Sequence, residues 1–305
     1  MLSVGYSNGE EIGVMVRLHM IGNRSAPRAL NYFRSLNHEV VELSATSTAG
    51  TIAAIQQAIV SDGANRVIVV GGDGMVHAAA NAIAPLRARY PEVVVGIIAL
   101  GTGNDFARAV GLKVDDEIAA AKACLEPGVS VDLLETSHGW VATVATCGFP
   151  ARVNRRANAM RRPKGPAKYT VATLALLPSV GSDRIEIILD GGSPSTQDLH
   201  LLAIGNTAYF GGGMKICPDA RSDSGSAEVV LVNTLGRLEV LRFLPTVFPG
   251  KHIQNHRTTV QRAHTIVLAG DPGVELWGDG EYLGLLPATI EVRPGALQIA
   301  GLNSV

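Results

Sequence analysis

The sequence of 305 residues has few cysteines, few aromatic residues and almost no net charge. Its three cysteines, Cys124, Cys147 and Cys217, lie far apart and show no metal-ligand spacing, so neither a disulfide framework nor a zinc site is predicted. A net charge of -1 gives no general attraction to nucleic acid, and no zinc-finger or basic-aromatic RNA-binding pattern is present. We therefore expect a protein of the reducing cytoplasm with no nucleic-acid partner.

Long apolar runs are missing as well. No segment offers the roughly 18 uninterrupted apolar residues of a membrane-spanning helix, so no transmembrane segment is predicted. The start, MLSVGYSNGEEIGVMVRL, has neither the basic region nor the long apolar core of a secretory signal. With 47% apolar residues the chain can nevertheless bury a large core, and its length suits two domains.

Strand and helix patterns alternate in the first part of the chain. Predicted strands are 14–21, 40–43, 67–70 and 93–100, and predicted helices are 26–36, 51–61, the segment after Gly74, and 104–110. Such alternation predicts a three-layer α/β domain with a parallel sheet covered on both faces. Ligands of these sheets bind at the carboxyl ends of the strands. We assign residues 1–131 to this domain.

From about residue 131 the pattern changes to short β-type runs separated by polar or glycine turns. Predicted strands are 140–146, 184–189, 199–204, 227–232, 265–268 and 289–292. This spacing predicts an all-β second domain, a β-sandwich, over residues 132–305. The cleft between the two domains is then the default active site.

The stretch VIVVGGDGMVHAAANAIA places Asp73 among Gly71, Gly72 and Gly74 at a turn from strand to helix. Such a turn directs backbone N–H groups and the positive end of the helix dipole at a ligand, which suits a phosphate. An unpartnered Asp73 would repel that phosphate unless Mg²⁺ or an ordered water bridges the two. The alternative is a tight turn in which Asp73 only caps the helix.

A second glycine turn, LGTGNDFARAVGL, follows the next predicted strand. Gly101 lets the backbone approach a ligand, Thr102 can donate to phosphate, and Asn104 and Asp105 lie where a helix begins. It is not the dinucleotide fingerprint, because Phe106 stands where the third glycine belongs. Asn104 or Asp105 as a plain helix cap is the alternative.

Four motifs in order resemble those of the diacylglycerol kinase catalytic-domain family, which includes bacterial lipid kinases and the sphingosine and ceramide kinases. They are GGDG at 71–74, GTGNDFAR at 101–108, GNTAYFGGGMKICPDA at 205–220 and GDGE at 278–281. GGDG by itself is shared with the related NAD kinases. The resemblance implies a nucleotide-binding α/β domain and a β-sandwich, with ATP and Mg²⁺ in the cleft between them.

The resemblance also implies a role for each matching residue. Gly71, Gly72, Asp73 and Gly74 would hold the nucleotide phosphates, with Asp73 acting through metal or water, and Gly101, Thr102 and Asn104 would line the same site. Glu281 would be the general base, with Asp105 and Asp279 as supporting acidic residues. Asn23 matches an asparagine of the family's early nucleotide-contacting segment, although the Pro and Gly that usually follow are absent here.

Phosphoryl transfer requires cations on the phosphates and a carboxylate that takes the hydroxyl proton. Glu281 can serve in this way only if the two domains face each other across a cleft. Taken alone, GDGE favours an acidic hairpin turn, since Asp-Gly between β-type runs is a strong turn signal. His77, in the helix after GGDG, either binds nucleotide phosphate or packs.

Three positions depart from the family pattern: Met75 replaces a threonine, Ala78 a glutamate, and Ser224 an aspartate. Asp223 and Glu228 are candidates for a second, structural cation site in place of the missing aspartate. These departures leave open a catalytically silent nucleotide-binding protein.

The segment from Arg155 to Lys168 carries six positive charges and no negative one, and it leads into the apolar run 169–177. This pattern fits adsorption to an anionic bilayer, and a solvated loop before a core helix is the alternative. A second apolar run, 241–248, lines a lipid-chain pocket or is core. A homodimer stays open.

We therefore predict an ATP- and Mg²⁺-dependent lipid kinase, cytoplasmic and peripherally membrane-associated, that converts diacylglycerol to phosphatidic acid. A sphingoid-lipid kinase and an NAD kinase are the enzymatic alternatives, and the later GGGM and DGE motifs argue against NAD kinase.

Overall fold

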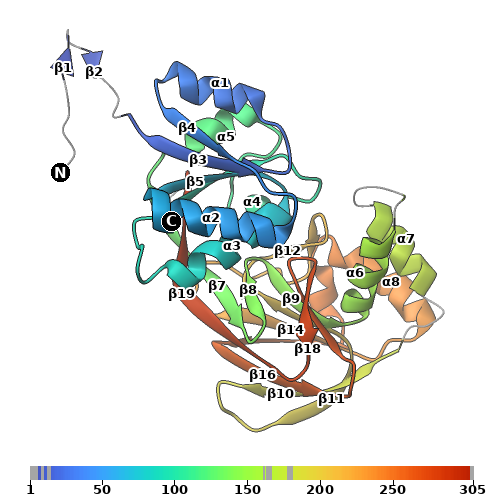
Figure 1. Ribbon diagram of the computed structural model, residues 1–305. Helices are drawn as coiled ribbons and strands as arrows, with labels where there is room; N and C mark the ends of the chain where they lie inside the picture. The colour runs from blue at the N-terminus through green and yellow to red at the C-terminus, as the bar shows by residue number, and fades with distance from the viewer. Residues whose placement is uncertain are drawn as a thin grey trace.

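The computed structural model describes residues 6–7, 10–11, 15–160, 162, 167–176 and 181–302. An α/β region at the N-terminal end of the chain lies against a larger, mostly β region (Figure 1). The predicted fold class, an α/β domain followed by a β-sandwich, is confirmed.

The α/β region is built on four parallel strands in the order β6-β5-β3-β4. Its elements are β3 (Arg17–Gly22), α1 (Pro27–Ser35), β4 (Glu39–Leu43), α2 (Thr48–Asp62), β5 (Arg66–Gly71), α3 (Asp73–Ile83), η1 (Ala84–Leu86), β6 (Val94–Ala99), α4 (Asp105–Ala109) and α5 (Glu117–Ala123). A further short pair, β1 (Tyr6–Ser7) and β2 (Glu10–Glu11), precedes them.

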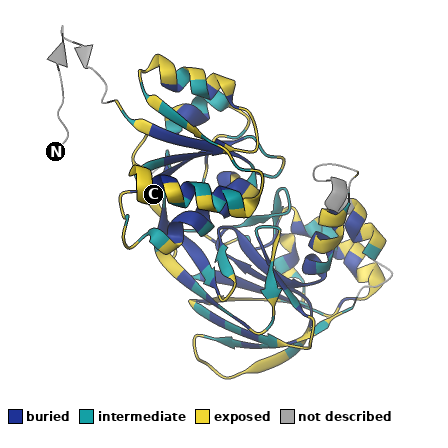
Figure 2. Cartoon of the chain, viewed as in Figure 1, coloured by how far each residue is buried: buried dark blue, intermediate teal, exposed yellow. Residues whose placement is uncertain are grey.

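Helices cover both faces of this sheet, which makes three layers (Figure 2). Val67 and Val69 of β5 pack under α2 and α3, whereas Ile68 and Val70 pack under α1 and α5. A strand buried on both faces reads as an uninterrupted apolar run, which explains the sequence VIVV.

The β-rich region is antiparallel and encloses a second apolar core. Its strands are β7 (Gly128–Thr136), β8 (Gly139–Val141), β9 (Val144–Gly148), β10 (Asp183–Leu189), β11 (Ser195–Gly205), β12 (Tyr209–Phe210), β13 (Met214–Lys215), β14 (Ala227–Asn233), β15 (Thr258–Ala263), β16 (Thr265–Gly270), β17 (Glu275–Gly278), β18 (Glu281–Leu285) and β19 (Ala288–Ala300).

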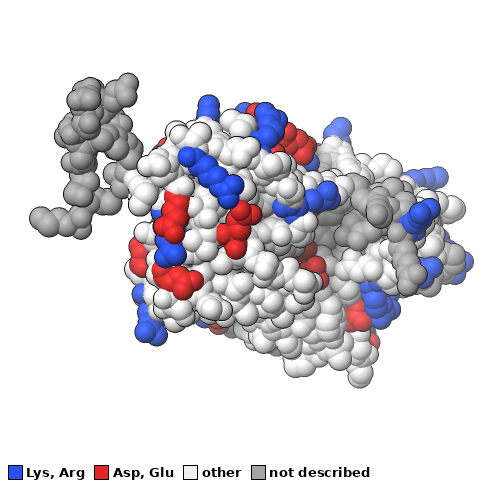
Figure 3. All heavy atoms as spheres, turned by 45° about the horizontal axis from the view of Figure 1, so that its top comes forward, with Lys and Arg blue, Asp and Glu red and all other residues white. Residues whose placement is uncertain are grey.

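Among its described residues, the β-rich region has three helices and a short 3-10 turn. They are α6 (Phe149–Ala159), α7 (Ala167–Leu176), α8 (Arg237–Val247) and η3 (Lys251–Gln254). No helix in the described ranges is both long and apolar enough to cross a membrane. On the face shown in Figure 3, acidic and basic side chains lie interspersed, as the net charge of -1 leads one to expect.

The long strand β19 joins the two regions. Near its start it pairs with β16, along its length it pairs with β7, and near its end Ile299 pairs in parallel with Val95 of β6. Both regions therefore share one hydrogen-bonded sheet. β7 also runs across the predicted domain boundary at residue 131, and the division into 1–131 and 132–305 stays a prediction.

The single strand predicted over 140–146 is wrong. The structure has two strands, β8 and β9, separated at Ala142 and Thr143. The backbone N–H groups of these two residues donate to the carboxylate of Asp279 and not to a neighbouring strand. A buried side chain from the far end of the sequence thus interrupts the ladder.

Helix α3 is hydrogen-bonded directly to the β-rich region through Asn81. The Asn81 side-chain amide donates to the carbonyl oxygen of Trp140 and accepts from its N–H, both at 2.9 Å. This pairing mimics one rung of a β-ladder and holds α3 against β8.

We expect Asn81→Ala to lower the free energy of unfolding by about 1–3 kcal/mol, because it leaves two backbone groups of Trp140 without their partners. Urea titration measures the change. Gln57→Ala, at an exposed position of α2, is the matched control and should change stability by less than about 0.5 kcal/mol. Equal stability of the two variants would show that the Asn81 contact does not support the fold.

Candidate active site

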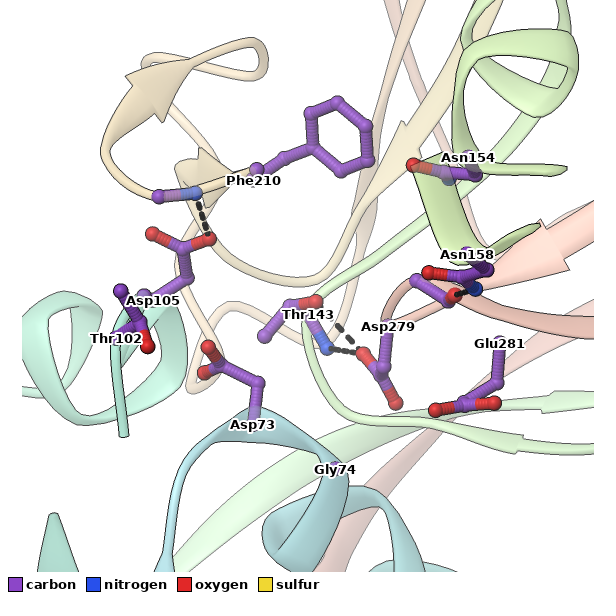
Figure 4. A pocket seen from close by; sticks show the side chains of 14 residues that line it. Asp73, Gly74, Thr102, Asp105, Thr143, Asn154, Asn158, Phe210, Asp279 and Glu281 are labelled. Carbon is purple, nitrogen blue, oxygen red and sulfur yellow. Dashed lines mark hydrogen bonds between the residues drawn. The ribbon is translucent and has the colours of Figure 1, made fainter. Parts of the chain in front are cut away.

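A polar cleft of about 290 Å³ lies between the two regions and is lined from both sides (Figure 4). Asp73, Thr102 and Asp105 come from the α/β region, at the carboxyl end of its parallel sheet. Thr143, Asp279 and Glu281 come from the β-rich region. The two glycine turns and the GDGE motif therefore meet in one cleft.

The two glycine turns touch each other through their backbones. A Cβ atom on Gly72 would lie 2.9 Å from the Cα atom of Gly101, so only glycine allows this approach. Asn104, with φ +52°, folds its side chain back onto Gly101, accepting from its N–H at 2.9 Å and donating to its carbonyl at 3.0 Å. Asn104 thus shapes the turn from behind the cleft.

Asp73 is the first residue of α3 and reaches across to the start of α4. Its Oδ1 accepts the Phe106 N–H at 3.0 Å, and its Oδ2 faces Gly103. Burial raises the pKa of Asp73, although hydrogen bonds from backbone N–H groups oppose the rise. A cation close by would favour its ionised form.

Asp105, the first residue of α4, binds the glycine loop between β12 and β13. The N–H groups of Gly212 and Gly213 donate to its two carboxylate oxygens, each at 2.7 Å. Both glycines have positive φ, +87° and +105°, which turns the two N–H groups toward one carboxylate. Burial and, secondly, the charge of Asp73 raise the pKa of Asp105 to about 6.

Asp279 has the most complete set of hydrogen bonds in the cleft. It accepts from the Thr143 hydroxyl at 2.6 Å, from the N–H groups of Thr143 and Ala142 at 2.7 and 3.0 Å, and contacts His77 Nδ1 at 2.9 Å. Burial would raise the pKa of Asp279, but these bonds and the charge of His77 outweigh it and lower the pKa. His77 therefore binds Asp279 across the two regions.

Glu281 begins β18, two residues after Asp279, and its side chain is exposed to the cleft. The turn before it has positive φ at Asp279 and Gly280, and Asn158 of α6 donates to the Gly280 carbonyl oxygen at 3.0 Å. Figure 4 shows the Glu281 carboxylate beside Asp279, on the side away from Asp73. Its position suits a base that acts on a molecule held between the two regions.

Asn154 of α6 is a cleft residue that the sequence did not reveal. Its side chain is only 1% exposed, yet neither amide atom has a hydrogen-bond partner within the described part of the chain. Leaving such a group unpaired is unfavourable, so this amide is available to a water or a ligand in the cleft. The only sequence signal is the pair Asn154 and Asn158, four residues apart and thus on one face of a helix.

The remaining predicted nucleotide residues lie behind these turns. Asn23 donates its backbone N–H to the Val70 carbonyl, and its Oδ1 would lie 2.3 Å from a Cβ atom built on Gly71. Asn23 and Gly71 are therefore neighbours, as their shared role requires, although neither lines the polar cleft. The nucleotide role of Asn23 stays a prediction.

At the predicted second cation site, protein donors occupy the Asp223 carboxylate and one oxygen of Glu228, whereas Oε1 of Glu228 is buried and has no hydrogen-bond partner among the described residues. Asp223 accepts two hydrogen bonds from the Arg221 guanidinium, at 3.0 and 2.8 Å, and Glu228 accepts the Asp219 N–H at 2.8 Å. Among the described residues no three His, Cys, Asp or Glu side chains are grouped to hold a metal ion. The second site stays a prediction.

Two family models together match most of the chain: the diacylglycerol kinase catalytic domain over residues 20–136, and the YegS C-terminal NAD kinase beta sandwich-like domain over residues 143–301. A diacylglycerol kinase from Mycobacterium tuberculosis is 33% identical over 310 residues, which covers 98% of each chain. This chain belongs to the diacylglycerol kinase catalytic-domain family. Membership of this family supports lipid kinase activity and confirms the resemblance inferred from the four motifs.

Solved structures of a diacylglycerol kinase and of an NAD kinase have folds similar to that of this chain. A diacylglycerol kinase from Bacillus anthracis is similar with a TM-score of 0.68 at 19% identity, and the match covers 95% of this chain and 97% of that one. An NAD kinase from Archaeoglobus fulgidus in complex with ATP is similar with a TM-score of 0.52 at 11% identity over 94% and 93%. At these identities the likeness concerns the fold alone.

The raised pKa of Asp105 predicts a pH-dependent difference between wild type and Asp105→Asn. Below 3.8 the carboxyl is protonated in both the folded and the unfolded state; above about 6 it is ionised in both. Between these values only the unfolded state has released the proton, so the wild type loses stability as the pH rises. Relative to Asp105→Asn, we expect a loss of about 3 kcal/mol across this window.

Denaturant titrations in Mg²⁺-free buffer, from below pH 4 to pH 7, test this expectation. Asp62→Asn, at an exposed position of α2, controls for the amide substitution itself. A stability difference between wild type and Asp105→Asn that stays constant over this pH range would contradict the raised pKa.

Proposed function

We propose that this protein is an ATP- and Mg²⁺-dependent lipid kinase that transfers the γ-phosphoryl group to the hydroxyl of diacylglycerol. The observation that carries the proposal is the meeting of Asp73, Asp105 and Glu281 on one cleft that adjoins an apolar pocket. Phe210, Gly211 and Gly212 line both spaces. A phosphorylated ligand and an apolar chain can thus lie next to each other.

Asp73 is the residue we assign to Mg²⁺, with Asp105 as its neighbour. The half-buried Asp73 and the buried Asp105 each have a raised pKa, and the charge of Asp73 contributes to the rise at Asp105, so a cation here would relieve repulsion. Mg²⁺ is commonly bound by one or two carboxylates together with substrate phosphates, which fits the residues present. When bound, the ion would neutralise phosphate charge during transfer.

Glu281 is the residue we assign as general base. The acceptor hydroxyl oxygen forms a bond to the γ-phosphorus, the bond from that phosphorus to the oxygen of the β-phosphate breaks, and ADP leaves. Glu281 takes the hydroxyl proton on its carboxylate. Its exposure to the cleft supports this role, since it must reach a molecule that enters from outside.

The three residues that depart from the family pattern do not line the polar cleft. Met75 is buried in the apolar core between α3 and the sheet, Ala78 is buried on the same helix, and the Ser224 hydroxyl lies within hydrogen-bond distance of the carbonyl oxygens of Arg221 and Ser226. His77, one position before Ala78, supplies a bond to Asp279. These contacts favour an active enzyme over a silent nucleotide-binding protein.

The first test measures transfer of labelled γ-phosphate from ATP, with Mg²⁺, to diacylglycerol, monoacylglycerol, ceramide, sphingosine and NAD. We expect label in diacylglycerol, and a loss of roughly 100- to 10,000-fold in Glu281→Gln, the range typical of a removed general base. Glu92→Gln, at an exposed position before β6, is the matched control. Label in sphingosine or NAD would replace the proposed acceptor, and ATP binding with no transfer would indicate a silent binding protein.

We also propose that the free amide of Asn154 binds the polar headgroup of the acceptor. Asn154 lies next to Val153, which lines the apolar pocket, and it lines the polar cleft together with Glu281. An amide at this junction can donate to an ester carbonyl oxygen while the acyl chains occupy the apolar side.

We expect Asn154→Leu to raise the KM for the acceptor about tenfold and to leave the KM for ATP unchanged. Its free energy of unfolding should be equal to that of the wild type or about 1 kcal/mol higher, because an unpaired buried amide is removed. Steady-state kinetics and urea titration of the same preparation measure both. Loss of stability with an unchanged acceptor KM would mean that Asn154 is structural.

A further inference from the structure

Helix α8 separates an apolar pocket from the solvent. The pocket holds about 120 Å³, and one face of α8 lines it with Val240, Phe243, Leu244 and Val247. Thr173 of α7 and Phe149 of α6 line the same pocket, so the three helices surround it. Figure 1 shows α6, α7 and α8 grouped at one end of the β-rich region.

A second face of α8 is apolar too, although it is exposed. Leu238 is 71% exposed and Leu241 is 45% exposed, and Phe248, directly after the helix, is 52% exposed. At about 100° per residue these three point to one side, with Arg237 and Arg242 at its two edges. Val171 and Leu174 of α7 are exposed apolar residues as well.

A helix that is apolar on both faces is normally buried on both. The inner face of α8 lines the pocket. The outer face packs against no other element within the described part of the chain. Phe248 belongs to both, because it lines the pocket and is half exposed. It therefore marks the place where the pocket meets the surface.

The charges around this outer face are mainly positive. Arg237, Arg242 and Lys251 are exposed. The acidic residue of α8, Glu239, accepts the Gly236 N–H at 2.7 Å and lies 4.0 Å from Arg257, so its charge is engaged locally. An apolar face bordered by cations is complementary to a surface with anionic headgroups above an apolar interior.

We propose that the outer face of α8 docks on an anionic lipid bilayer, with Leu238, Leu241 and Phe248 inserted below the headgroups. This surface is distinct from the basic segment Arg155–Lys168, of which residues 161 and 163–166 lie outside the described residues and Arg155 is paired with Glu275. The docking proposal rests on the proposed lipid kinase function only for the reason why the protein would bind a bilayer. The binding itself does not depend on kinase activity. An acceptor lipid would pass from the bilayer into the pocket beside Phe248 without crossing water.

The test compares vesicles of phosphatidylcholine with and without phosphatidylglycerol, in co-sedimentation without ATP. We expect Leu238→Ser combined with Leu241→Ser to reduce partition to anionic vesicles by about tenfold or more, since both side chains stop contributing apolar insertion. Arg237→Gln combined with Arg242→Gln should weaken binding to anionic vesicles, by about fivefold per charge, and not to pure phosphatidylcholine. Added salt should weaken wild-type binding.

Leu36→Ser combined with Val60→Ser is the matched control, because both are exposed apolar residues of the α/β region. Leu238 and Leu241 do not line the pocket, so transfer to a water-soluble short-chain diacylglycerol should be unchanged in the leucine variant, while transfer to vesicle-bound lipid falls. Vesicle binding by wild type that is lost in the variant, without any kinase activity, would reject the proposed function and keep the docking surface.

Three results would overturn the docking surface. They are no binding of wild type to anionic vesicles, equal binding by wild type and the leucine variant, or light scattering that shows a wild-type dimer converted to monomer by the variant with no change in vesicle binding. The last result would mean that a second copy covers α8.

Discussion

The arrangement of the cleft depends on one buried carboxylate, Asp279, whose side chain is 1% exposed. A buried charge is costly by several kcal/mol unless donors surround it. Here the partners come from two separate segments: His77 on α3, and Ala142 and Thr143 in the gap between strands β8 and β9. Satisfying this carboxylate therefore brings helix α3 and the GDGE turn together. Asp73, at the start of the same helix, and Glu281, two residues after Asp279, are placed opposite each other as a consequence.

The acidic residues of the cleft differ in charge environment, and the difference has a physical cause. Asp279 has hydrogen-bond donors and a histidine that hold its pKa low, whereas the half-buried Asp73 and the buried Asp105 have raised pKa values. The hydrogen bonds of the Asp279 carboxylate are thus satisfied by the protein without a ligand. The Asp73 and Asp105 pair is the part of the cleft that gains most from an added cation. The same electrostatics separate a carboxylate that the protein itself satisfies from two that an added cation would stabilise.

Local features of the site could be predicted from the sequence, and long-range ones could not. The turn around Asp73 follows from a β-branched run, glycines and a helical pattern that lie next to each other in sequence. The bond from His77 to Asp279 spans 202 residues, and no pattern near either residue signals it. Asn154 was missed because a buried unpaired amide is recognisable only when its surroundings are known. The prediction of a single strand over 140–146 was wrong for the same reason, because Asp279, which interrupts that strand, is distant in the sequence.

Asp105 connects the polar cleft to the apolar pocket. Its carboxylate belongs to the α/β region and stands next to Asp73, yet its two oxygens hold Gly212 and Gly213, which form a wall of both the polar cleft and the apolar pocket. Whatever changes the charge near Asp73 therefore acts on the same group that positions this wall. A rigid hairpin would need no such tether, but three successive glycines with positive φ have little intrinsic preference for one conformation. The carboxylate supplies the order that the glycine loop lacks, and the α/β side of the polar cleft thereby helps to shape the apolar pocket.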